Sequence, residues 1–344
     1  MSTLAQHAEI LKLARILGAN PDQLEPLAKL EAPAIRALRE RVSASLFDAD
    51  RHLFQRIATA TKLVPAAVAG LIAEKALGPL LCARVAGSLP ADRAIDIAKR
   101  QKTDFLAEVC LQIDPRQVRE LIAGMPVQQS VDVAIELSRR REYITMGRFV
   151  DSLPEPSMRA ILKALTDDEA LLRIGFFVED PSQLSAVIDM LPPQRLHHMI
   201  ELAVQRGAEL WPEALALINA IAAPQRRMMA AQAAKLADAD INRMVELTHV
   251  HQLWTSLLPV VAEMGDTDLQ HLSRTKALQD DAVLTAMILA ADAAQLWPQL
   301  LPLVTQMDAA MLQRLAAIAG QQSADVLGRL NKALQSLAPQ TQKK

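Results

Sequence analysis

QLWTSLLPVVAEM at residues 252–264 decides the fold, because two closely similar stretches stand 43 residues to either side of it. These are ELWPEALALINAI at residues 209–221 and QLWPQLLPLVTQM at residues 295–307, and the three stretches hold the only tryptophans of the chain. A fixed period of roughly 20–50 residues is the signature of stacked repeat proteins. The sequence therefore predicts a repeat architecture rather than a series of independent globular domains.

The repeat extends beyond the tryptophans. When the chain is cut into 211–253, 254–296 and 297–339, apolar residues fall into register while polar positions drift. This pattern is expected where each unit buries one face against its neighbour. The apolar columns are Leu215, Leu258 and Leu301; Ile221, Met264 and Met307; Met229, Leu272 and Leu315; Ile241, Leu284 and Leu327; and Met244, Met287 and Leu330.

The elements of each unit are predicted to be short helices. Apolar residues recur at three- and four-residue spacing over runs of roughly 10–15 residues. Glycine supplies only 11 of 344 residues and aromatic residues only 3%, whereas the strong helix formers alanine and leucine dominate. We therefore expect an all-α fold, an α-solenoid or superhelix of short helices in repeats of 40–43 residues, with essentially no sheet.

Upstream of the tryptophans the period loosens. IDPRQVRELIAGMP from Ile113 and LPEPSMRAILKALT from Leu153 share apolar positions at a spacing of 40 residues. Because a solenoid unit contacts only its neighbours, such irregular units are tolerated. We predict one continuous solenoid with an N-terminal helical capping region at 1–88, irregular helical repeats at 89–210, three 43-residue repeats at 211–339 and a flexible tail at 340–344.

Charge and hydropathy restrict the partners. The formal net charge of −2, from 37 basic and 39 acidic residues, argues against nucleic acid as the main partner. The most apolar stretch, residues 63–87, is interrupted by Glu74, Lys75 and Arg84, so no transmembrane segment is predicted. With only two cysteines and no signal-peptide pattern at the N-terminus, the sequence predicts a cytoplasmic protein.

Two groups of residues are candidates for binding. Trp211, Trp254 and Trp297 occupy one column, which fits either packing between repeats or a ladder of exposed rings that holds a partner. Arg139, Arg140 and Arg141 form the densest basic cluster, at an expected helix end. There they fit either a solvated cationic last turn or a contact with a phosphate or an acidic partner.

Few residues are candidates for a metal or catalytic site, and their spacing is only partly that of known sites. His197 and Glu201 lie four residues apart on one expected helix face, and Glu246 and His249 have the Glu-x-x-His spacing of carboxylate-bridged metal sites. A complete site of that kind needs two such motifs and two further acids, so no metal and no cofactor is predicted. Phosphate-binding loops and nucleophile elbows are also missing from the sequence, and whether the protein is an enzyme stays open, with a non-enzymatic role favoured.

Several segments resemble known helical repeats. Units of 40–43 residues with three short helices resemble the armadillo and HEAT class. LPADRAIDIAKR, IDPRQVRELIAGMP, SLPEPSMRAILKAL and MLPPQRLHHMIELA, within residues 89–205, are similar to the cytosolic N-terminal superhelical domain of the MgtE magnesium channels. The resemblance implies a fold and a protein-contacting role. It does not extend to transport or Mg²⁺ sensing, since no pore segment is found.

The favoured function is a non-catalytic scaffold or adaptor that binds an as yet unknown protein partner through a solenoid surface. Self-association as a homodimer is a further expectation, because apolar terminal units need covering. The hydrophobic content of 51% keeps open a carrier or peripheral binder of an apolar small molecule or lipid. A HEAT-like nucleic-acid-processing protein is the third alternative, and the charge balance disfavours it.

Overall fold

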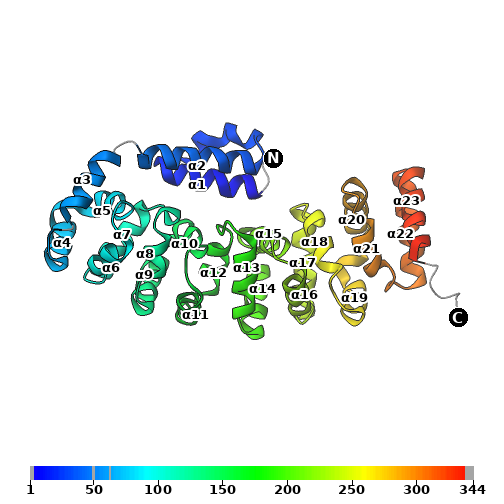
Figure 1. Ribbon diagram of the computed structural model, residues 1–344. Helices are drawn as coiled ribbons and strands as arrows, with labels where there is room; N and C mark the ends of the chain where they lie inside the picture. The colour runs from blue at the N-terminus through cyan, green and yellow to red at the C-terminus, as the bar shows by residue number, and fades with distance from the viewer. Residues whose placement is uncertain (1–3, 49–50, 62, 338–344) are drawn as a thin grey trace, which may run out of the picture. The chain divides into compact units, whose positions relative to one another are not determined.

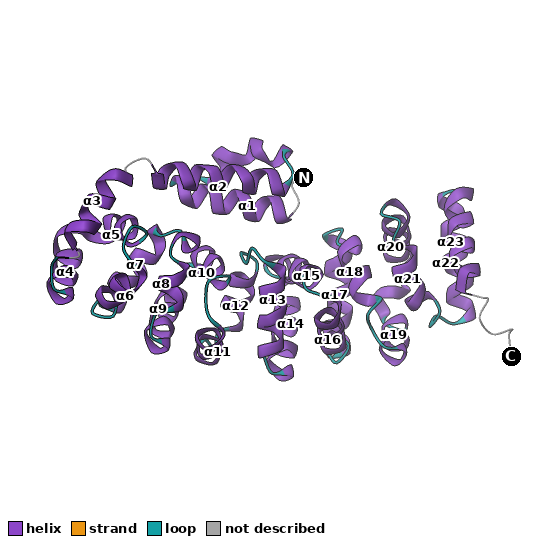
Figure 2. Cartoon of the chain, viewed as in Figure 1, coloured by secondary structure: helices purple, strands orange, loops and turns teal. Residues whose placement is uncertain are grey.

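The computed structural model describes residues 4–48, 51–61 and 63–337, and throughout these residues the chain is helical, with 23 α-helices and no strand (Figure 1, Figure 2). The expected all-α class is therefore confirmed. The chain forms two compact units, Met1–Gln183 and Leu184–Lys344, and the division falls inside α13 (Pro181–Met190). The segment boundaries expected at 88 and 210 stay a prediction, and the tail expected at 340–344 lies outside the described residues.

The N-terminal unit contains twelve helices within its described residues, with 3₁₀ turns at Pro21–Lys29 and Pro115–Gln117 and a π-helical turn at Ala73–Leu77. The helices are α1 (Leu4–Leu17), α2 (Ala32–Asp48), α3 (Arg51–Thr61), α4 (Ala66–Ile72), α5 (Gly78–Ala86), α6 (Ala91–Ala98), α7 (Thr103–Gln112), α8 (Arg119–Ala123), α9 (Val127–Arg139), α10 (Tyr143–Val150), α11 (Glu155–Ala164) and α12 (Asp168–Gly175).

Helices α1 and α2 form an antiparallel-type hairpin that packs together along its length (Figure 1). Between them, the side chain of Asn20 caps the 3₁₀ turn by accepting a hydrogen bond from the backbone N–H of Asp22. The backbone N–H of Asn20 donates in turn to Oε1 of Gln23. The hairpin contacts the rest of the unit partly through a small apolar cluster in which Ala8 meets Phe176 and Phe177, the residues that follow α12.

Helices α10 and α12 approach each other closely at Gly147. A Cβ atom at this position would lie 2.6 Å from Cβ of Phe177 and 2.8 Å from the carbonyl oxygen of Ile174. Only glycine fits without a shift of the neighbouring backbone. This contact fixes where the second half of α10, which carries Arg148, lies against the end of α12 and the residues that follow it.

The C-terminal unit contains ten further helices within its described residues. They are α14 (Pro193–Arg206), α15 (Trp211–Ala220), α16 (Ala223–Ala233), α17 (Asp238–Val250), α18 (Trp254–Val261), α19 (Asp266–Ser273), α20 (Asp281–Ala293), α21 (Trp297–Val304), α22 (Ala309–Gln322) and α23 (Ala324–Leu337), with 3₁₀ turns at Gly207–Glu209 and Lys276–Gln279.

The starts of the last nine helices are regularly spaced. Helices α15, α18 and α21 each begin at a tryptophan, 43 residues apart, and the helices that follow them begin at the same intervals. Helix α18 packs against both α15 and α21, and α17 packs against both α14 and α20. Fourteen of the fifteen residues in the apolar columns are buried, and Leu327 is half-buried.

The residues just before Trp254 and Trp297 share one backbone conformation. Gln252 and Gln295 adopt φ values of 56°, in the left-handed region, and the N–H of the next residue bonds back to the preceding helix, Leu253 to Thr248 O and Leu296 to Ala291 O. A left-handed residue followed by such a bond terminates a helix and satisfies its last carbonyls. The chain thereby turns so that the following tryptophan begins a new helix.

One helical stretch satisfies the length and hydropathy of a membrane span within the described residues. It is Ala66–Ala86, with a mean hydropathy of 1.5 over its most apolar window, of which 22% is buried. A single stretch of this kind is weak evidence for a span, because core helices and signal sequences pass the same test.

Candidate functional site

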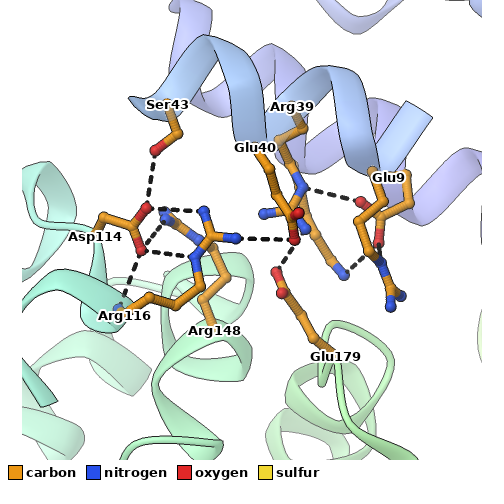
Figure 3. Close-up of polar contacts among 10 residues, drawn as sticks. Glu9, Arg39, Glu40, Ser43, Asp114, Arg116, Arg148 and Glu179 are labelled. Atoms are coloured by element: carbon orange, nitrogen blue, oxygen red, sulfur yellow. Dashed lines mark hydrogen bonds and ion pairs between the residues drawn. The ribbon is translucent and has the colours of Figure 1, made fainter. Parts of the chain in front are cut away.

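The N-terminal unit contains a network of buried and half-buried charged side chains between the α1–α2 hairpin and α7–α12 (Figure 3). The hairpin contributes Glu9, Lys12, Arg36, Arg39, Glu40 and Ser43, and the remainder of the unit contributes Asp114, Arg116, Arg148 and Glu179. Charges this deeply placed are costly unless they are paired. Their partners therefore indicate what positions the hairpin.

Glu9 is the centre of one half of the network. Its carboxylate lies 3.0 Å from Nζ of Lys12 and 2.9 Å from Nε of Arg39, and the side chains of all three are at most 3% exposed. Arg36, which is more exposed, adds a third cation at 3.2 Å. Burial alone raises the pKa of Glu9, but the positive charges of Lys12 and Arg39 outweigh it, and the pKa is lowered. Glu9 is therefore ionised at neutral pH.

Arg39 connects the hairpin to the loop after α12. Its side chain is 0% exposed, and Nη2 lies 2.9 Å from Oε1 of Glu179. The two groups are close enough for an ion pair, but their geometry is not that of a hydrogen bond. Both Nη atoms of Arg39 are buried, and neither makes a hydrogen bond to a described residue. Burial lowers the pKa of the neighbouring Lys12, and Glu9 and Glu179 only partly oppose this effect.

Asp114 is the centre of the other half. Oδ2 accepts hydrogen bonds from Oγ of Ser43 at 2.9 Å and from Nη2 of Arg116 at 2.8 Å, and Oδ1 accepts from Nε of Arg116 at 3.1 Å. Arg116 also pairs with Glu40 of α2 at 2.9 Å. Burial raises the pKa of Asp114, but the hydrogen bonds and charge of Arg116, with the charge of Arg148, bring it down to about 2.

Asp151, just after α10, is a second carboxylate of interest. Burial raises its pKa to about 6, with the negative charges of Glu179 and Asp180 adding to the effect, and its Oδ1 has no hydrogen-bond partner among the described residues. Glu179, in the loop after α12, thus pairs with Arg39, and its negative charge helps to raise the pKa of Asp151 to about 6. A carboxyl group with such a pKa can exchange a proton at physiological pH.

The tryptophan column lies in the interior of the C-terminal unit. The exposed fractions of Trp211, Trp254 and Trp297 are 2%, 3% and 8%. Nε1 of Trp211 donates to Oγ1 of Thr248 at 3.1 Å, and Nε1 of Trp297 donates to Asp292 at 3.3 Å, whereas Nε1 of Trp254 is buried without a partner. The three rings are therefore buried, and their use as a binding column stays a prediction.

The basic cluster at the end of α9 is engaged with acids of its own surface. Arg139 forms two hydrogen bonds with Glu136, at 2.8 and 2.6 Å, and Arg140 contacts both Glu136 and Glu108. Arg141 has a φ of 58°, so it ends the helix in the left-handed region. The side chain of Arg139 is 70% exposed, which leaves it accessible to a partner from solvent.

The histidines and acids considered as metal ligands make separate contacts. Nδ1 of His197 lies 3.2 Å from the carbonyl oxygen of Gln232, and Glu201 lies 3.5 Å from Nδ1 of His198. Nδ1 of His249 is buried without a hydrogen-bond partner among the described residues. Across the described ranges no group of three or more His, Cys, Asp or Glu side chains is placed to hold a metal ion, and Glu246 joins none.

Sequence reasoning did not identify the charge network. Asp114 is recognisable as a helix-capping residue because it precedes Pro115, and it does cap the 3₁₀ turn by accepting from the backbone N–H of Arg116. Nothing local distinguishes Glu9 or Arg39 from exposed helix residues. Lys12 is an i,i+3 neighbour of Glu9, as on many exposed helix faces, and the contacts of Arg39 with Glu9 and Glu179 come from other parts of the unit. Comparison with protein-family models, curated proteins and solved structures finds no match. The resemblance to HEAT, armadillo and MgtE-type repeats therefore stays a prediction.

Proposed function

We propose that this protein is an α-solenoid scaffold that binds a protein partner through its N-terminal unit. The solenoid arrangement is supported by the contacts in the C-terminal unit. Asn219 bonds to Ser256 O across 37 residues, Arg243 to Val204 O across 39, and Arg314 to Asp281 across 33. Contacts offset by about one repeat are expected where each unit touches its neighbours and little else.

The observation that carries partner binding is the uneven distribution of exposed apolar side chains. Ten of the fourteen large hydrophobic residues that are exposed in the described chain lie between residues 17 and 80. On α4, Val68, Leu71 and Ile72 are 46%, 59% and 42% exposed, and the spacing places them on one helix face. Leu53 of α3 and Leu80 of α5 are each 53% exposed. Concentrated exposure of this kind marks interaction surfaces.

The test uses charge substitutions on this surface. We expect Leu71→Glu and Leu80→Glu to lower recovery of the same co-purifying protein by at least tenfold in quantitative affinity capture, because an apolar anchor that is truncated or charged typically costs 2 kcal/mol or more, roughly a thirtyfold loss. Val250→Glu is the matched control, since Val250 is 71% exposed in the other unit. If no captured protein depends on Leu71 or Leu80, the proposal is wrong.

Self-association is examined with the same variants. Sedimentation equilibrium of the wild type against Leu71→Glu reports whether the partner is a second copy of this chain. A dimer that dissociates in Leu71→Glu and persists in Val250→Glu identifies the exposed α3–α5 side chains as the dimer contact.

A second candidate function rests on the low burial of Ala66–Ala86. We propose, as the alternative, that this stretch lies against a lipid surface or holds an apolar ligand. Co-sedimentation of the wild type with neutral phosphatidylcholine vesicles, lost in Leu71→Glu and retained in Val250→Glu, would favour it over the protein partner. Native mass spectrometry that finds no bound small molecule, together with no vesicle binding, excludes it.

A further inference from the structure

The described part of the N-terminal unit contains a small polar pocket where α1, α2, α5, α7 and α10 meet. Its volume is about 90 Å³. Since a water molecule occupies about 30 Å³ in the liquid, the pocket has room for roughly three waters or one small polyatomic ion. Its polar lining side chains are Arg15, Ser43, Arg84, Gln112, Asp114 and Arg148.

The lining has an excess of positive charge. Three of the six polar side chains are guanidinium groups, and Asp114 is the only acid among the lining residues. Both oxygens of Asp114 already accept hydrogen bonds from Arg116, and Ser43 adds another. Arg116 therefore takes up most of the hydrogen-bonding capacity of Asp114, which leaves Arg148 a longer ion pair with the same carboxylate.

Arg148 is the most deeply placed of these arginines. Its side chain is 9% exposed, and its nearest acidic atom, Oδ1 of Asp114, is 3.7 Å away, beyond hydrogen-bond distance. No hydrogen bond from its guanidinium to a described residue is found. A guanidinium carries five N–H donors, so Arg148 in the pocket wall has donors available for a ligand. Figure 3 shows Arg148 beside Asp114, below the hairpin.

Arg84 and Arg15 complete the wall. Nη1 of Arg84 donates to the carbonyl oxygen of Leu46 at 2.6 Å, which positions the guanidinium without neutralising it. Arg15 pairs with Glu142 at 2.7 Å, so its charge is largely satisfied. Arg84 thus reaches the pocket without an acidic partner among the described residues, and Arg148 reaches it with a long ion pair to Asp114, an acid that Arg116 already engages.

We propose that this pocket binds a tetrahedral oxyanion of phosphate size, as the free ion or as the phosphoryl group of a larger molecule, with Arg84 and Arg148 as its principal ligands. Arginine pairs with phosphate oxygens through two parallel hydrogen bonds, and its guanidinium is weakly hydrated, so it gives up water readily in a small cavity. The amide of Gln112 supplies a neutral donor beside them. This site is independent of the exposed α3–α5 side chains and of the partner proposed for them.

The bound oxyanion would connect two parts of the unit. Arg84 belongs to α5 and Arg148 to α10, while Ser43 and Leu46 of the wall belong to the hairpin. A ligand held by the folded unit and not by the unfolded chain stabilises the fold by RT ln(1 + L/Kd), where L is the ligand concentration, so the stability rises with that concentration. Binding and a rise in Tm are therefore expected together.

The test is isothermal titration calorimetry of the full chain with inorganic phosphate, in a chloride buffer of constant ionic strength. We expect saturable binding of one phosphate, weakened at least tenfold in Arg148→Gln and in Arg84→Gln, because each loses charge-assisted hydrogen bonds. Arg159→Gln is the matched control, as Arg159 is exposed on α11 and pairs only with Glu155. It is expected to bind phosphate as the wild type does.

Glycerol 3-phosphate distinguishes the two sources of the ligand. Equal binding of the ester and the ion means that the pocket recognises a phosphoryl group with its substituent outside, and binding of phosphate alone means that the free ion is the ligand. The proposal is overturned if the wild type shows no saturable phosphate binding, or if Arg84→Gln and Arg159→Gln bind phosphate equally. Arg84→Gln alone decides the matter should Arg148→Gln not fold, since Arg84 lies at the rim and is half-buried.

Discussion

Ser43 on α2 donates a hydrogen bond from Oγ to Oδ2 of Asp114 over 2.9 Å, although 71 positions separate the two residues in the chain. Asp114 in turn binds Arg116, which pairs with Glu40 one helical turn before Ser43. One carboxylate thus connects the N-terminal hairpin to the start of the 3₁₀ turn after α7. Its most deeply buried charges, Glu9, Lys12 and Arg39, each require a partner, because a buried charge that loses its partner is strongly destabilising.

Asp114→Asn is expected to destabilise the protein by about 3 kcal/mol at pH 7, since it leaves Arg116 and Arg148 facing a neutral amide. The pKa of Asp114 is depressed to about 2, so its stabilisation is present above the unfolded pKa near 4 and is lost as the pH falls toward 2. Urea unfolding at pH 7 and pH 3 measures both effects. Glu155→Gln, at a 62% exposed side chain, is the control and should change stability by less than about 1 kcal/mol. Equal losses in the two variants would contradict the role given to Asp114.

Asp151→Asn is expected to stabilise the protein at neutral and higher pH, whereas Asp114→Asn destabilises it. Burial raises the pKa of Asp151 to about 6, so the folded state holds its proton more tightly than the unfolded state and is penalised when the carboxyl is ionised. That penalty is present above pH 6 and disappears as the pH falls toward 4. The variant should therefore be more stable than the wild type by about 1–2 kcal/mol at pH 8 and similar to it at pH 4. A gain that does not vary with pH would rule out this explanation.

Trp211→Phe and Trp254→Phe are expected to differ, although both rings are buried. Nε1 of Trp211 donates to Thr248, whereas Nε1 of Trp254 has no partner among the described residues, so its removal also relieves an unpaired buried donor. Trp254→Phe should cost at least about 1 kcal/mol less in free energy of unfolding than Trp211→Phe. Chemical denaturation followed by circular dichroism measures the difference. Strong acrylamide quenching of the native fluorescence would show that the rings are exposed and would remove the basis of the comparison.

Gln252→Gly is expected to stabilise the protein by about 1 kcal/mol, because a left-handed backbone costs about 1–2 kcal/mol for a residue with a Cβ and nothing for glycine. Gln252 is exposed and has a φ of 56°, so no side-chain packing is lost. Gln313→Gly, the same change at an exposed position inside α22, should destabilise by about 1 kcal/mol. Thermal unfolding of the two variants decides the point, and effects of the same sign would show that the helix end at Gln252 is not under strain.

The sequence alone predicted the helical class and a spacing of 43 residues in the last part of the chain, because local propensity and spacing are both written along the chain. Helices α15, α18 and α21 begin at Trp211, Trp254 and Trp297, although the spacing did not say where each helix starts. Fourteen of the fifteen residues in the apolar columns are buried. Burial of the rings depended on which helices surround them.

The charge network was decided by the tertiary structure. Arg15 and Glu142 pair across 127 positions, and nothing in the spacing of either residue indicates the other. Several contacts in the C-terminal unit join residues 33 to 39 positions apart, whereas the α1–α2 hairpin contacts the remainder of its own unit across separations as different as 71 and 127 positions. A single ion pair between distant helices leaves no pattern in one sequence, because any exposed acid and base would look the same until the fold brings two of them together.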